Sequence, residues 1–104
     1  MIKFDDFESN LESILGNSNK MRMFSNYILS LPNKIKDGKA MNNLLDSLSS
    51  PDRLMFAVHY HDLKEIQKII VTASFKILNV TDNQEEFAIR MNKVMSSLKK
   101  DYEI

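Results

Sequence analysis

The chain has 104 residues, of which 43% are hydrophobic and 27% charged, and its formal net charge is zero. This length and composition predict one folded domain over residues 1–104 and argue against a disordered chain. The absence of cysteine excludes disulfides and thiolate metal sites, and no apolar run is long enough to span a bilayer. We therefore expect a cytoplasmic protein that needs no cofactor and has no membrane partner.

The charge is unevenly spread along the chain. Residues 1–15 hold one lysine and four acidic residues, whereas residues 16–40 hold five basic residues and one aspartate. This dipolar distribution is weaker than the basic excess of a dedicated nucleic-acid-binding protein, so it disfavours nucleic acid as the partner. Eleven lysines against three arginines, together with ten asparagines, give a phage-like composition. Such a bias is expected of an AT-rich genome, for example that of a phage or another mobile element.

The first half of the chain is divided by residues that start or stop helices. Apolar residues at 3.6-residue spacing predict a first helix that ends near Gly16 and a second over about 18–31, which Pro32 stops. Residues 32–38 are predicted to form a loop, and a short third helix follows over about 39–49.

The most prominent feature of the sequence is an uninterrupted helical pattern over about 51–79. Ser50 supplies an N-cap hydroxyl and Pro51 fits the first helical position, while no Gly or Pro follows before position 104. A helix of that length would measure about 42 Å, whereas a compact domain of this size has a diameter of about 30 Å. The pattern therefore predicts a long central helix that is the spine of an elongated bundle, is kinked, or packs against another chain.

The C-terminal part has a clean amphipathic pattern, which predicts a helix over about 83–100. A short connection favours an antiparallel packing of this helix on the long central one. Strand-like alternation is lacking throughout the chain. The expected fold class is therefore all-α, a compact bundle of four to five helices.

The apolar surface of the long central helix is wider than one neighbouring helix can cover. Ile66, Ile70 and their neighbours lie on one face, while Val71, Phe75 and Leu78 lie on another. The simpler interpretation makes this the central helix of the bundle, with neighbours on both flanks. The alternative hypothesis assigns Val71, Phe75 and Leu78 to an interface with a partner protein or a second subunit.

One cluster contains residues that are capable of catalysis. His59 lies one helical turn from Asp62, and the pair is the centre of a possible metal or hydrolytic enzyme. The neighbouring His61 is two residues from His59. Side chains two residues apart on a helix point in nearly opposite directions, so the two histidines cannot bind the same metal ion. A core histidine and a solvated histidine explain these residues more simply, so no metal site and no catalytic residue is expected.

The basic residues Lys34, Lys36 and Lys39 lie close together in the predicted loop and offer a possible anion-binding site. Nucleic acid or a small anionic ligand would be bound there, although a solvated loop is the commoner explanation of such lysines. A DNA-reading helix is disfavoured because the segment 40–46 has no Arg or Lys that contacts bases or phosphates.

The function that the sequence favours is therefore non-enzymatic. We expect a small adaptor, inhibitor or chaperone-like protein that binds a partner protein, acts as a homo-oligomer, and covers its excess apolar surface in doing so. Two alternatives stay open: the anion binder that uses Lys34, Lys36 and Lys39, and the enzyme centred on His59 and Asp62.

Overall fold

The computed structural model describes residues 11–48 and 59–103, and within these ranges every regular element is a helix. After a helical segment over 11–15 come α2 (Ser18–Leu29), α3 (Asn33–Lys36), α4 (Lys39–Ser47), α6 (Glu65–Val80) and α7 (Gln84–Tyr102). The predicted all-α class is therefore confirmed. None of the helices in this part of the chain is long and apolar enough to cross a membrane.

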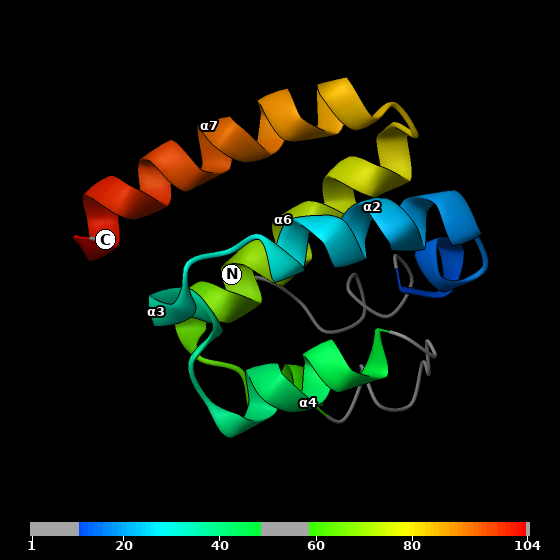
Figure 1. Cartoon of the computed structure of the whole chain (residues 1–104). Helices are drawn as coiled ribbons and strands as arrows, with labels where there is room; N and C mark the ends of the chain where they lie inside the picture. The colour runs from blue at the N-terminus through cyan, green and yellow to red at the C-terminus, as the bar shows by residue number, and fades with distance from the viewer. Residues whose placement is uncertain (1–10, 49–58, 104) are drawn as a thin grey trace.

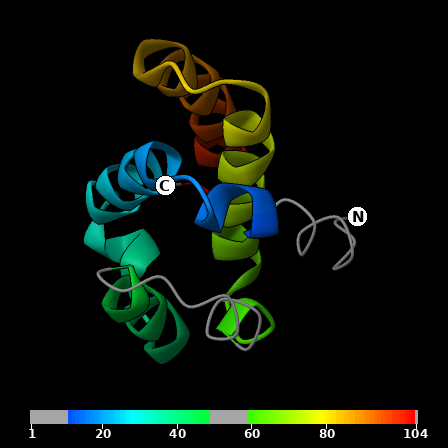
Figure 2. The same cartoon turned by 90° about the vertical axis from the view of Figure 1, so that its right-hand side faces the viewer.

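The helices α2 and α6 lie side by side in the middle of the bundle, with α7 on one side of them and α4 on the other (Figures 1 and 2). α6 and α7 run in opposite directions, which confirms the antiparallel C-terminal helix (Figure 1). The molecule measures 34 × 30 × 25 Å along its principal axes. An unbroken helix of about 42 Å would exceed the longest of these dimensions.

The predicted long central helix over 51–79 is wrong in one respect, because the helix is broken before Glu65. His59 and Tyr60 are helical, the next four residues form a turn, and the helix starts again at Glu65; residues 51–58 lie outside the described ranges. The Tyr60 hydroxyl lies 3.2 Å from Oγ1 of Thr72. Twelve residues of straight helix would separate these positions by about 18 Å, so the turn is what returns Tyr60 to the side of α6.

The start of α6 is fixed by the buried side chain of Gln67, which is 1% exposed. Its Oε1 atom accepts a hydrogen bond from the backbone N–H of Lys64 at 2.9 Å, as a residue at the N3 position does in a capping box. Its Nε2 atom donates to the carbonyl oxygens of Ile35 at 2.6 Å and Asp37 at 2.9 Å. One side chain therefore ends the turn before α6 and holds the α3–α4 connection against it.

The connection between α6 and α7 is closed by its own hydrogen bonds. The Thr81 hydroxyl donates to Oε2 of Glu86, and the backbone N–H of Asn83 donates to the Thr81 hydroxyl oxygen. Oδ1 of Asn83 accepts from the N–H of Glu86, so Asn83 is the N-cap of α7. The hydrogen bond from Thr81, and then those from Arg90, lower the pKa of Glu86. These hydrogen bonds, with Thr81 buried at their centre, hold the hairpin in a sharp turn.

The core is built around α6. Ile70, Phe75 and Leu78 are fully buried, and the ring of Phe75 meets that of Phe24 from α2 edge to face at 4.7 Å between centroids. The Met91 sulfur of α7 lies 3.8 Å from the Ser74 hydroxyl. Contacts with α2, α3 and α7 thus cover α6 on several sides, which accounts for its wide apolar surface.

Candidate functional site

The three residues predicted to form an interface lie in the core of the single chain. Val71 is 1% exposed, and Phe75 and Leu78 are 0% exposed. A partner cannot reach these side chains in the folded chain, so the interface assigned to them has to be corrected. The physical reason is that α2 packs on this face of α6, where Phe24 contacts Phe75.

The other apolar face of α6 is the one that stays partly open. We define the α6 stripe as its five apolar residues that are half-buried or exposed: Ile66, Ile69, Ala73, Ile77 and Val80. The first four pack against the edge of the core, and Val80 is 68% exposed. Their spacing follows one side of a helix over more than three turns. The sequence shows both apolar faces of α6, and the face that holds Val71, Phe75 and Leu78 is the one that the core covers.

The spacing of the α6 stripe is symmetric about Ala73. Ile69 and Ile77 lie four residues before and after it, and Ile66 and Val80 lie seven residues before and after it. A second α6 laid antiparallel on the first, with a two-fold axis beside Ala73, therefore sets Ile66 opposite Val80 of the second copy. The same axis sets Ile69 opposite Ile77 of the second copy. Such self-complementarity is the requirement for an isologous dimer interface.

The three lysines predicted to lie in a loop are carried by two short helices. Lys34 and Lys36 belong to α3, whereas Lys39 is the first residue of α4. The Lys36 ammonium donates to the carbonyl oxygen of Leu29 at 2.9 Å and so serves the C-terminal end of α2. Lys39 lines a pocket.

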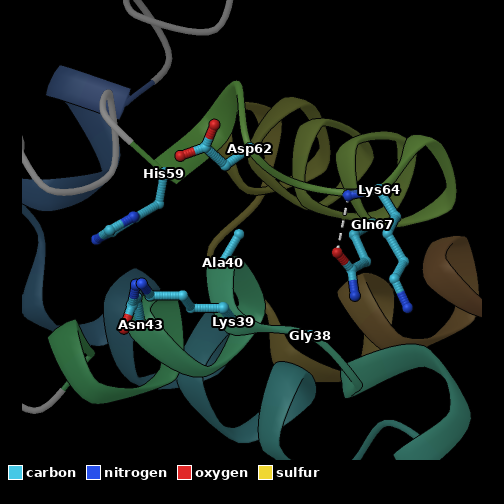
Figure 3. Close-up of a pocket in the computed structure, with 8 residues that line it drawn as sticks. All are labelled: Gly38, Lys39, Ala40, Asn43, His59, Asp62, Lys64 and Gln67. Carbon is cyan, nitrogen blue, oxygen red and sulfur yellow. Dashed lines mark hydrogen bonds between the residues drawn. The ribbon is translucent and has the colours of Figure 1, made fainter.

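That pocket lies between the start of α4 and the turn that precedes α6, and it has a volume of about 460 Å³. We call it the α4 pocket; it is lined by Gly38, Lys39, Ala40, Asn43, His59, Asp62, Lys64 and Gln67. The side chains of Lys39, Asn43 and His59 lie toward one end of it, and those of Lys64 and Gln67 toward the other (Figure 3). Sequence reasoning singled out Lys39 and His59 separately, because nothing local shows that α4 faces the turn.

The side chains of His59 and Asp62 point in different directions (Figure 3). The contact between them is a backbone hydrogen bond, from the N–H of Asp62 to the carbonyl oxygen of His59 at 3.1 Å. The Asp62 carboxylate turns away from α4, whereas the imidazole points along the pocket (Figure 3). Over the described ranges no three His, Cys, Asp or Glu side chains are grouped so that they could hold a metal ion.

A second hollow of about 200 Å³ lies between α2 and α7, with Tyr27 and Phe87 among its lining residues. The two rings meet edge to face at 5.5 Å between centroids. Burial raises the pKa of Tyr27 to about 12. Asn26, Ser30 and Gln84 add polar atoms to the lining, so the hollow has the size and composition to take one side chain rather than a whole ligand.

Comparisons with protein families, with curated proteins and with solved structures found no match to this chain. Its function has to be inferred from its own surfaces. The α6 stripe, the α4 pocket and the α2–α7 hollow are the three features of the described residues on which an inference can rest.

Proposed function

We propose that this chain is a non-enzymatic binding protein that pairs with a second copy of itself through the α6 stripe and offers its remaining surface to a partner protein. The observation that carries the proposal is the symmetric spacing of the stripe about Ala73. Exposed apolar residues are common on single chains and mean little one by one. Four half-buried apolar residues and the exposed Val80, aligned on one side of α6 and spaced symmetrically about Ala73, support pairing with an identical helix.

Charges at the ends of the helix favour the antiparallel pairing. Lys64 immediately precedes α6, and Asp82 follows its end. The two-fold axis beside Ala73 places Lys64 of one copy level with Asp82 of the second copy. Both side chains are exposed in the single chain. Opposite charges at both ends of an interface favour the encounter and fix its register, although they add little affinity when solvated.

The size of the stripe limits the strength of the pair. An α-helix of 16 residues is about 24 Å long, and one helical face is smaller than the roughly 800 Å² per partner of a standard interface. We therefore expect a reversible dimer with a dissociation constant that is micromolar or weaker. Such a dimer forms at high local concentration and exchanges its subunits readily.

The test is the solution molar mass, measured by light scattering after size exclusion over a range of protein concentrations. The wild-type chain should shift from 12.1 kDa toward twice that mass as its concentration rises. Ala73→Glu places two carboxylates beside the two-fold axis and should weaken the dimer at least tenfold. Ala88→Glu makes the same change at an exposed position of α7 that lines the α2–α7 hollow and is not part of the α6 stripe, and it should leave the dimer intact.

Two outcomes would overturn the proposal. If the wild-type chain stays monomeric up to millimolar concentration, it does not self-associate. A dimer that Ala88→Glu disrupts as strongly as Ala73→Glu is held by a different surface.

A further inference from the structure

The α4 pocket contains a polar atom with no partner. Nε2 of His59 is buried and has no hydrogen-bond partner. A buried polar atom that is left unpaired costs free energy, so such atoms in folded proteins generally have a partner, which can be water, an ion or a ligand. The imidazole lines the pocket, and a molecule bound there would meet its edge.

Two more side chains at the same end of the pocket are able to donate hydrogen bonds. Lys39 and Asn43, one helical turn apart on α4, extend toward the end of the pocket where His59 lies (Figure 3). No residue of the described ranges forms a hydrogen bond or an ion pair with the Lys39 ammonium or the Asn43 side chain. The cation, the amide and the imidazole thus offer three uncommitted donor groups to a single cavity.

The backbone at the pocket wall favours the same kind of ligand. No side chain caps the first turn of α4, whose first residues, Lys39 and Ala40, line the pocket. Uncapped N–H groups and the positive end of the helix dipole both favour an anion. Gly38 precedes this turn with a φ of 123°, which other residues rarely adopt, and the Lys64 ammonium that lies beside it adds positive charge at the start of α4.

The remaining charges do not cancel this preference. The Lys64 ammonium is 4.0 Å from the Asp37 carboxylate in an exposed ion pair at the far end of the pocket. Among the described residues that line the pocket, Asp62 is the one carboxylate, and its side chain turns away from α4 (Figure 3).

From this arrangement we infer that the α4 pocket binds a small phosphate anion, either inorganic phosphate or a phosphate monoester, through His59, Lys39 and Asn43. A phosphate offers several acceptor oxygens to these three side-chain donors, more than one carboxylate supplies. The volume of about 460 Å³ leaves room for a small organic group beyond the phosphate. The site includes no residue of the α6 stripe, so this inference does not depend on self-association.

The experiment is a titration of the ¹⁵N-labelled full chain with sodium phosphate, followed by NMR, with sodium chloride adjusted to keep the ionic strength constant. Saturable shifts are expected at the amides of Gly38, Lys39 and Ala40 and at the His59 ring. Lys39→Met and His59→Phe should each weaken binding at least tenfold. Lys34→Met removes an exposed lysine of α3 that does not line the pocket, and it should change the affinity less than twofold.

Repeating the titration with glycerol phosphate distinguishes the two sources of phosphate. Tighter binding of the monoester identifies an organic ligand, and equal binding identifies free phosphate. Shifts that fail to saturate, or that Lys34→Met reduces as much as Lys39→Met, would overturn the inference, because they indicate diffuse attraction to surface lysines. If His59→Phe fails to fold, Lys39→Met still decides, since the Lys39 side chain is exposed and can be replaced without disturbing the core.

Discussion

Replacing Gln67 by Met tests whether one side chain holds the α3–α4 connection against α6. Met has a similar length and flexibility but cannot donate a hydrogen bond, so the change removes hydrogen bonds and leaves little cavity. Three backbone groups lose their partner: the N–H of Lys64 and the carbonyl oxygens of Ile35 and Asp37. At about 1 kcal/mol of net stability for each bond, the expected loss is about 3 kcal/mol.

A loss of that size is large for a small domain, whose total stability is about 5–15 kcal/mol. The assay is urea denaturation followed by far-UV circular dichroism. With a slope of about 1.5–2 kcal/mol per molar urea, the midpoint should fall by about 1.5–2 M. Lys76→Met, at an exposed position of the same helix, is the matched control and should change stability by less than about 0.5 kcal/mol.

The result that refutes this reasoning is a midpoint for Gln67→Met within about 0.3 M of the Lys76→Met control. Water from the adjoining α4 pocket would then be replacing the amide at no cost. The start of α6 would in that case be set by the burial of Leu63 and Tyr60, not by the hydrogen bonds of Gln67.

Two further predictions concern the core and the α2–α7 hollow. Phe75→Ala should cost about 3–5 kcal/mol because the ring is fully buried against Phe24; urea denaturation that shows less than 1 kcal/mol would mean that Phe75 is not core. For Tyr27, burial raises the pKa in the folded chain to about 12, while the unfolded chain ionises near its ordinary value of about 10. The stability that Tyr27 contributes is therefore complete below about pH 10 and is lost as the pH rises from 10 toward 12. Tyr27→Phe should flatten this part of the stability curve, and a variant that loses stability as steeply as the wild-type chain would contradict the assignment.

The helices and their type were largely predictable from sequence because their signals are local. The predicted helices over 18–31, 39–49 and 83–100 correspond to α2, α4 and α7 within a few residues at each end. Pro32 and the apolar spacing marked these elements. The short helix α3 was missed because four residues carry too little periodicity to be distinguished from a loop.

The break before α6 could not be predicted from the same signals. Residues 61–64 contain no Gly or Pro, and the hydrogen bonds that hold the turn against the α3–α4 connection join Gln67 to Ile35 and Asp37, about thirty positions earlier in the chain. A local pattern cannot reveal a partner so distant. The one local hint is Asp62 followed by Glu65, a spacing that often marks a helix start.

The candidate sites depended on the packing of distant segments. The sequence shows that α6 has two apolar faces, but which face α2 covers is decided by contacts such as Phe24 with Phe75. The α4 pocket likewise exists only because α4 and the turn with His59 face each other. Single residues of both sites were visible in the sequence, whereas their grouping was not.

The most direct test of self-association through the α6 stripe is a mixing experiment at Ala73. The Ala73→Glu and Ala73→Lys variants each place like charges beside the two-fold axis, so each alone should be monomeric by light scattering. Mixed in equal amounts, they should form a dimer because a glutamate then faces a lysine of the second copy. If the mixture stays monomeric under conditions in which the wild-type chain dimerises, or if each variant dimerises alone, the α6 stripe does not pair about Ala73.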